Sequence, residues 1–408
     1  MLGKNSLLEI FLLCFADSTG EIDLSVNGNG PFSYSWTGPA PFINPGTEDL
    51  INLEAGTYSV SVADSNGCVA TQNITVGSPA VGLSINSAVS NLQCYNDFSG
   101  SIDILITGGS GFIGSAITKH LVKRKNKVIV FDNNSRGKSS RLKEVKNKIR
   151  FIKGDIRNRK KLLSIRDQVD TVIHLAYVNG TKFFYKKPFE ILDIAVNGLI
   201  NILDFCKKKN VKNFYLASSS EVYQNPFKIP TNEEEMLKIP SIYNPRYSYG
   251  GGKIISELYG LHFAKKFLKK FIIFRPHNVY GKDMGNEHVI PEFINRFKKL
   301  RNKEKFLIYG TGKEVRSFIH IDDFVHGFDR IFKKGKNQEI YNIGTNEKIT
   351  ISKLAKLIAK VLRKNIKFKK TKVLKGSPSI RCPDIKKIKK LGFKHNISLK
   401  NGIKKILN

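Results

Sequence analysis

Hydrophobic and polar residues alternate in two different ways along this chain. Between residues 16 and 100, short runs such as Tyr58 to Val62 alternate one residue at a time and end at turn-forming glycine, asparagine and serine. This pattern predicts strands of a small β-sandwich. After residue 101, short apolar runs are separated by stretches long enough for helices. That succession predicts an α/β fold, a doubly wound parallel sheet with helices on both faces.

The α/β part has a regular order of elements. Ile104 to Ile106 forms the first apolar run, and residues 115–124 follow with the pattern of a helix. Further strands are predicted at 127–131, 149–152, 169–173 and 211–220, with a sixth that ends near 274.

The β part contains an internal repeat that is cut short. The motifs at 14–17 and 20–23 recur at 94–97 and 100–103, and the second copy stops after one strand. A glycine-rich stretch begins where the turn of that copy should lie. We interpret the chain as two unrelated parts joined at a chance similarity, by recombination or by an error of sequence assembly.

Charge divides the chain at the same place. The 408 residues carry a formal net charge of +34, but the first 100 hold one basic and nine acidic side chains, so +42 falls on the rest. Such a basic surface can bind nucleic acid or attract anionic substrates. We find no aromatic RNA-binding signature or helix-turn-helix pattern, and we expect no nucleic-acid partner.

Membrane and metal sites are not indicated either. We find no apolar stretch long enough to span a bilayer, and we expect no membrane partner. Residues 7–15 are apolar but short, so a weak signal peptide and a first strand of the repeat stay equally open. The eight histidines lack partners at the spacing of metal ligands, and we predict no metal.

The glycine-rich stretch offers the first chemistry. Gly108, Gly111 and Gly114 follow the first strand and open a helix, which is typical of a turn that binds a diphosphate with backbone amides. Asp132 ends the second strand, where a carboxylate can accept both ribose hydroxyls of an adenosine and repels a 2′-phosphate. We therefore predict NAD as cofactor, although Arg136 nearby would suit the phosphate of NADP.

Polar residues also follow the fifth strand, at Ser218 to Tyr223. Further on, Tyr249 and Lys253 are four residues apart, which places both on one face of a helix. A fixed ammonium favours the phenolate, so we predict Tyr249 to be a base near neutral pH. The three glycines between them each cost roughly 1 kcal/mol in a helix relative to alanine, which suggests a close approach by cofactor or backbone.

Residues 102–408 resemble the extended short-chain dehydrogenase/reductases, the family of nucleotide-sugar epimerases and dehydratases. The resemblance lies in the ordered motifs TGGSGFIG, FDN, GDI, HLA, VNG, SSSEVY, YxxxK, RPHNVYG and RSFIHIDD. It implies a Rossmann-type domain at 101–281, a smaller substrate lobe at 282–408, and a homodimer. It assigns cofactor binding to Gly108, Gly111, Phe112, Ile113, Gly114, Asp132, Asn133, Asp155, Ile156, Leu175, Ala176, Asn197, Tyr249 and Lys253.

The resemblance also implies the catalytic and substrate-binding residues. Tyr249 would remove a proton from a sugar hydroxyl, Ser219 would hydrogen-bond the same oxygen, and Lys253 would bind the nicotinamide ribose. The resulting 4-keto sugar is shared by epimerases, decarboxylases and dehydratases. Substrate binding is assigned to Ser219, Asn278, Arg316 and Arg381, with a nucleotide-diphosphate sugar as the partner.

Glu221 bears on which reaction follows. Ser-Glu-Val-Tyr is similar to UDP-glucuronate decarboxylases and some dehydratases, where a carboxylate can act at C5, but the adjacent acid of the dehydratases is replaced by Ser220. We expect a 4-epimerase first, a decarboxylase next and a 4,6-dehydratase third. His277 and Lys282 depart from the family pattern and leave the sugar open.

Residues 12–104 resemble the repeats of gliding-motility surface adhesins, through Tyr34 to Trp36, Ala55 to Tyr58 and Asp64 to Cys68. Cys14 and Cys68 would pair as a disulfide if this part were secreted, and would be reduced thiols otherwise. The enzyme part predicts a cytoplasmic protein, whereas the repeat in residues 1–100 alone suggests the cell surface. A surface adhesin with a passenger NAD-binding domain is therefore the rival interpretation.

Overall fold

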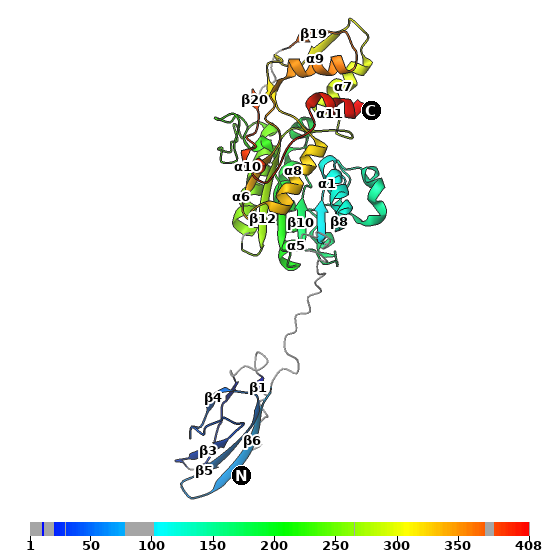
Figure 1. Ribbon diagram of the computed structural model, residues 1–408. Coiled ribbons are helices and arrows are strands. Elements are labelled where there is room, and N and C mark those ends of the chain that lie inside the picture. Colours follow the sequence, from blue (N-terminus) through cyan, green and yellow to red (C-terminus); the bar gives the residue numbers. More distant parts are fainter. Residues whose placement is uncertain are drawn as a thin grey trace. The chain divides into compact units, whose positions relative to one another are not determined.

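The computed structural model describes residues 10–11, 20–28, 30–77, 102–264, 266–371 and 379–407. The chain divides into two compact units, Met1–Val89 and Ser90–Asn408 (Figure 1). Cys14 and the second copy of the repeat up to residue 101 lie outside the described residues, so the predicted disulfide is not tested. Cys68 is exposed and is a free thiol.

The first unit is built from short strands in two sheets. β5 is paired on both sides by antiparallel strands, and its alternating pattern places Tyr58, Val60 and Val62 in a core with Trp36. The indole of Trp36 donates to the carbonyl of Thr47 at 2.8 Å. One sheet has the order β1 (Ile10–Phe11), β6 (Val69–Gly77), β5 (Gly56–Ala63), β3 (Ser33–Thr37), and the other pairs β2 (Gly20–Ile22) with β4 (Leu50–Leu53).

A parallel sheet of seven strands forms the centre of the second unit. All neighbouring strands run in the same direction, as the continuous apolar runs predict. The chain order reverses between β7 and β10, which are adjacent. The strand order is β17 (Ile340–Ile343), β12 (Lys270–Pro276), β11 (Asn213–Ala217), β10 (Thr171–His174), β7 (Asp103–Thr107), β8 (Lys127–Asp132), β9 (Ile149–Lys153).

Helices cover both faces of this sheet. Side chains alternate along β7, so that Ile104 and Ile106 belong to one hydrophobic cluster and Leu105 to the other. The first cluster packs against α1 (Phe112–Lys123), η1 (Ser139–Lys148), α8 (Ile321–Lys334) and α10 (Lys386–Lys389). The second packs against α2 (Arg159–Leu163), α3 (Thr181–Lys186), α4 (Pro188–Asp193), η2 (Ile194–Gly198), α5 (Leu199–Lys208), α6 (Ser248–Tyr259) and η5 (Gly260–Ala264).

A smaller lobe lies at one end of the second unit, where Figure 1 shows α7, α9, α11 and β19 together. It has its own core, which includes Phe293, Phe297, Phe306 and Ile358. Its elements are α7 (Val289–Lys299), β14 (Lys305–Ile308), α9 (Ile351–Val361), β19 (Lys367–Lys370) and α11 (Leu399–Leu407). The remaining short elements are η3 (Ser220–Val222), η4 (Pro245–Tyr247), β13 (Val279–Tyr280), β15 (Val315–Arg316), β16 (Ile319–His320), β18 (Ile349–Thr350) and β20 (Ile380–Arg381).

The fold class is therefore confirmed: a Rossmann-type sheet with a smaller lobe, preceded by short β strands. The helix that follows the first strand of the sheet begins at Phe112, three residues before the predicted start, directly after Gly111. The predicted boundary at residues 281 and 282 falls within one compact unit and stays a prediction.

Candidate active site

Two glycines are required by the turn between β7 and α1. Gly108 has a positive φ of 73°, and a Cβ there would lie 2.6 Å from the amide nitrogen of Ala176. A Cβ on Gly114 would lie 2.1 Å from the carbonyl oxygen of Gly108. α1 begins directly after Gly111 without a side-chain cap, which leaves its first amides available to an anion such as a diphosphate.

Carboxylates at the ends of β8 and β9 lie beside this turn. Asp132 is buried and accepts the backbone N–H groups of Ser110, at 2.9 Å, and Asn134, at 2.8 Å. Asn133 donates to the carboxylate of Asp155 at 3.0 Å. A carboxylate has about four lone-pair positions, so Asp132 retains the capacity to accept ribose hydroxyls.

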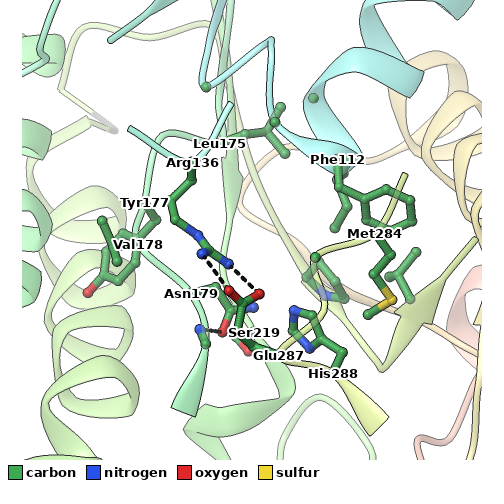
Figure 2. Close-up of a pocket in the computed structure, with 18 of the residues that line it drawn as sticks. Phe112, Arg136, Leu175, Tyr177, Val178, Asn179, Ser219, Met284, Glu287 and His288 are labelled. Carbon is green, nitrogen blue, oxygen red and sulfur yellow. Dashed lines mark hydrogen bonds and ion pairs between the residues drawn. The ribbon is translucent and has the colours of Figure 1, made fainter. Parts of the chain in front are cut away.

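A cavity of about 1300 Å³ opens at the carboxyl ends of these strands (Figure 2). It lies where the strand order reverses between β7 and β10, the position at which open α/β sheets bind ligands. The cavity brings together residues from the glycine turn, from the ends of β8, β9, β10, β11 and β12, and from the smaller lobe. The predicted residues that line it are Gly108, Gly111, Phe112, Ile113, Gly114, Asp132, Asn133, Asp155, Ile156, Leu175, Ala176, Ser219, Glu221, Tyr249, Lys253, Asn278, Arg316 and Arg381.

Ser219, Tyr249 and Lys253 meet on the wall formed by β11 and α6. Tyr249 and Lys253 lie one turn apart on α6 and are both buried. The side chain of Ser219 hydrogen-bonds the phenol of Tyr249. The ammonium of Lys253 donates to the carbonyl oxygen of Ala217 at 2.6 Å. A hydroxyl and a phenol are thus hydrogen-bonded, with an ammonium one helical turn away, and such groups can transfer a proton to or from a bound hydroxyl.

Burial controls the charge of this group. It raises the pKa of Tyr249 above its ordinary value, and the hydrogen bond from Ser219 lowers the pKa only in part. It also lowers the pKa of Lys253 to about 7, against the opposing charge of Glu257. In the chain by itself, burial therefore dominates the pKa of Tyr249, and the charge that lowers this pKa is that of Arg381. That the ammonium of Lys253 brings the pKa of Tyr249 close to neutral stays a prediction.

Three arginines surround Glu221 at the substrate end of the cavity. Arg316 and Arg381 are paired residues on the parallel strands β15 and β20, which sets their side chains next to each other. Arg381 donates to Glu221 at 2.9 Å through one Nη, while its Nε and other Nη are buried and have no hydrogen-bond partner among the described residues. Burial and the neighbouring Arg381 lower the pKa of Arg316 to about 10. Together with Arg246, this cluster can bind a diphosphate.

Arg136 does not stand free to bind a 2′-phosphate. Its guanidinium donates to both oxygens of Glu287 at 3.2 Å and lies over the ring of Phe183 at 4.5 Å. Figure 2 shows this pair in the cavity, with Asn179 and His288 close by. Glu287 comes from the loop before α7, so the pair joins the cofactor side of the cavity to the smaller lobe.

One predicted residue is not brought to the cavity. Asn197 is exposed on η2 and donates to Asp193 at 2.6 Å, and it is absent from the cavity wall. The VNG motif contributes to packing through its glycine: a Cβ on Gly198 would lie 2.4 Å from the side chain of Ile156. The side chain of Asn278 reaches the cavity but donates to the carbonyl of Ser317 at 2.8 Å.

Several cavity residues were not found from the sequence. Tyr177, Arg246, Glu287 and His288 line the cavity. Tyr177 directly follows the HLA motif. The triple glycine that it packs against was the feature of the sequence that could have indicated a large side chain here. Glu287 is 151 residues from its partner Arg136, and no pattern in the sequence links them.

The residues present fit NAD. The open amides of α1 suit the diphosphate, the carboxylate of Asp132 suits an unphosphorylated ribose, and Lys253 lies one helical turn from Tyr249. The family comparison agrees with this geometry. The chain belongs to the NAD dependent epimerase/dehydratase family, whose model matches residues 104–344, and NAD is its cofactor.

Relatives within the family catalyse different reactions. A dTDP-D-glucose 4,6-dehydratase of Dictyostelium discoideum is 35% identical over 63% of this chain and 62% of its own length. A UDP-N-acetyl-alpha-D-glucosaminuronate decarboxylase of Bacillus cytotoxicus is 32% identical over 74% of this chain and 96% of its own length. The crystal structure of a Thermotoga maritima UDP-glucose 4-epimerase with UDP-glucose is 28% identical, has a TM-score of 0.68, and covers 75% of this chain and 97% of that one.

The first unit matches a second family. The SprB repeat model matches residues 12–41, which supports the interpretation of a fused repeat. Among the residues that the structure describes, no helix is long and apolar enough to cross a membrane.

Proposed function

We propose that this chain is an NAD-dependent nucleotide-sugar 4-epimerase. The observation that carries the proposal is the meeting of Ser219, Tyr249 and Lys253 on one wall of the NAD cavity, opposite an arginine cluster. NAD supplies an acceptor that takes a hydride from the sugar carbon and can return it. Tyr249 removes the hydroxyl proton, Ser219 holds the same oxygen, and Lys253 binds the nicotinamide ribose.

The arginine cluster supports a nucleotide diphosphate as substrate. Arg246, Arg316 and Arg381 carry three positive charges, and Glu221 offsets one of them, so that the two remaining charges balance those of a diphosphate ester. Arginine suits this group because its planar fork pairs two phosphate oxygens. Asn278 would contribute at the same end of the cavity.

The charge of Glu221 bears on the rival reactions. Burial by itself raises the pKa of this carboxyl, but the charges of Arg381 and Arg246 outweigh it and hold the pKa below the ordinary value. A carboxylate kept ionised by an arginine at 2.9 Å is a poor proton donor. We assign Glu221 a structural role through its ion pair with Arg381. Decarboxylation is the second candidate, because an ionised carboxylate could still accept a proton at C5 and because Ser-Glu-Val-Tyr is similar to the pattern of UDP-glucuronate decarboxylases.

A product assay tests the proposed reaction. The full chain is incubated with UDP-, dTDP- and GDP-hexoses and with UDP-glucuronate, and each product is analysed by mass and by sugar stereochemistry. We expect an unchanged mass with inversion at C4 of a neutral hexose. Loss of carbon dioxide from UDP-glucuronate would replace the proposal with a decarboxylase, and loss of water with a dehydratase.

Exposed apolar side chains support a homodimer. Phe189 and Leu192 on α4 are 80% and 38% exposed, and Ile255 and Leu258 on α6 are 40% and 53% exposed. α4 packs against α6, so these side chains extend over one helical surface. A contiguous apolar patch of this kind is typical of a protein interface.

Substitutions on this surface test the dimer. We expect the double variant Phe189→Glu/Leu258→Glu to be a monomer by light scattering, because buried unpaired carboxylates oppose association. Ile242→Glu is the control, since Ile242 is 83% exposed but lies outside these helices. A wild-type chain that is already monomeric would overturn the proposal.

If the chain acts as the proposed enzyme, we expect it in the cytoplasm, where NAD and sugar nucleotides are available. The alternative hypothesis, a surface adhesin, implies the cell surface and is supported by the SprB match at 12–41. Cell fractionation with an antibody against the second unit distinguishes them, since turnover of sugar nucleotides requires the intracellular pool.

A further inference from the structure

Tyr177 lies between the two residues assigned to proton transfer and cofactor binding. It follows β10 and lines the cavity. The ammonium of Lys253 lies over its ring, 3.9 Å from the centroid. The ring of Tyr249 meets it edge to face, with centroids 5.1 Å apart and planes at 89°. Tyr177 therefore contacts both members of the Tyr-Lys pair.

The triple glycine of α6 makes room for this ring. A Cβ on Gly252 would lie 2.3 Å from the hydroxyl oxygen of Tyr177 and 2.8 Å from the Cβ of Ala195. Any larger residue at this position would displace the phenol. The triple glycine was predicted to allow a close approach, and at Gly252 the group that packs against the helix is the side chain of Tyr177.

The hydroxyl of Tyr177 has no hydrogen-bond partner among the described residues, although it is buried. Figure 2 shows it turned away from Arg136 and Glu287 in the cavity. A phenol placed for proton relay would hydrogen-bond Tyr249 or face the substrate. The contacts that Tyr177 does make are those of its ring.

The ring of Tyr177 stabilises the ammonium of Lys253, which burial separates from water. The ammonium is buried and has one hydrogen-bond acceptor, the carbonyl of Ala217 at 2.6 Å. An aromatic face attracts a cation through its quadrupole, and the attraction is strongest where water is excluded. The same contact fixes the direction in which the ammonium points.

Other charges act on this group from every side. Glu257 on α6 favours the ammonium of Lys253, and His174 at the end of β10 is held neutral by burial and by that ammonium. Glu221 on η3 raises the pKa of Tyr249 and Arg381 on β20 lowers it. Within the described part of the chain, none of these groups forms a hydrogen bond or ion pair with Lys253, so the ring of Tyr177 is the contact that a substitution can remove selectively.

We propose that Tyr177 is a positioning residue, whose ring and not its hydroxyl holds Lys253 and Tyr249 in place for proton transfer. The role of Tyr177 in proton transfer rests on the proposed function. The contact between the ring and the ammonium is independent of the substrate.

Two substitutions separate the ring from the hydroxyl. Tyr177→Phe keeps the ring, so we expect kcat within about twofold of the wild-type value. Tyr177→Leu removes it, so we expect about a tenfold lower kcat at neutral pH. Without the ring the ammonium is less stable and assists the phenolate less, so the acid limb of the kcat profile should move about one unit to higher pH. KM for the sugar nucleotide should change little.

A measurement without substrate keeps the inference testable if the proposed reaction is wrong. The titration of Lys253 is followed in the full chain by ¹³C NMR of its Cε, and the signal is assigned by its loss in Lys253→Met. We expect the midpoint to fall in Tyr177→Leu and to be preserved in Tyr177→Phe. Equal loss of kcat in both variants would assign the role to the hydroxyl, and an unchanged midpoint in folded Tyr177→Leu would overturn the proposal.

Discussion

Replacing Tyr249 with phenylalanine should abolish turnover while NAD stays bound. The substitution removes one oxygen and leaves the ring stacked on Phe184, with centroids 4.7 Å apart. General acid–base groups contribute roughly 10²–10⁴-fold to a rate, so we expect kcat to fall about 10³-fold. The loss should be nearly all in kcat, since the phenol acts on the reacting hydroxyl and the diphosphate is bound elsewhere in the cavity.

Two measurements check this prediction. Steady-state rates with the substrate found in the product assay give kcat, and a fluorescence titration gives NAD affinity. Tyr259→Phe is the matched control, because Tyr259 is on the same helix but outside the cavity. Unchanged turnover in Tyr249→Phe would exclude Tyr249 as the base, and loss of turnover in Tyr259→Phe would mean that α6 does not tolerate the change.

The pH dependence of the wild-type enzyme follows from the same group. Burial holds the pKa of Tyr249 high and that of Lys253 near 7. The phenol must lose its proton to act, so activity should rise with pH on the acid side. The sequence prediction considered only the nearby ammonium and left out burial, which raises the pKa of Tyr249. The distance between Tyr249 and Lys253 along the helix can be deduced from spacing, whereas desolvation depends on the residues around them.

The fold could be predicted because each part of the pattern is local. Apolar runs such as Ile104 to Ile106 and the glycines that follow determine a strand, a turn and a helix without long-range information. The identity of the cavity walls followed from the rule that strand ends gather at one edge of a parallel sheet. Asp132 and Ser219 were predicted in this way, whereas Tyr249 was predicted from its spacing to Lys253 on one face of a helix.

Contacts between distant segments could not be predicted in the same way. The pair of Arg136 and Glu287 joins loops of two lobes, and Arg381 reaches Glu221 from 160 residues away. Asn197 shows the opposite error, because a motif was matched but its side chain faces away from the cavity and bonds Asp193. Motif position determines where a residue lies along the chain, and the packing of η2 determines which way it points.

Arg381→Met should weaken both substrate binding and folding, for two separable reasons. The variant loses Nε and one Nη, two buried donors without a partner in the part of the chain that the structure describes, and we expect KM for the sugar nucleotide to rise about 100-fold. It also leaves Glu221 buried without its ion pair, since the two side chains are only 11% and 17% exposed. Breaking such a pair costs about 3 kcal/mol in the free energy of unfolding.

The double variant Arg381→Met/Glu221→Gln separates these effects. Removing the unpaired charge should restore most of the stability, measured by urea unfolding, but none of the substrate affinity. The pKa of Glu221 is lowered in the native state, so its contribution to stability is present above the unfolded-state pKa and is lost as the pH falls through the native value. In Arg381→Met the pKa rises because burial then dominates, so the stability difference from wild type should be largest near neutral pH and shrink in acid. An unchanged KM in the double variant would assign Arg381 to the fold alone and leave Arg316 and Arg246 to bind the diphosphate.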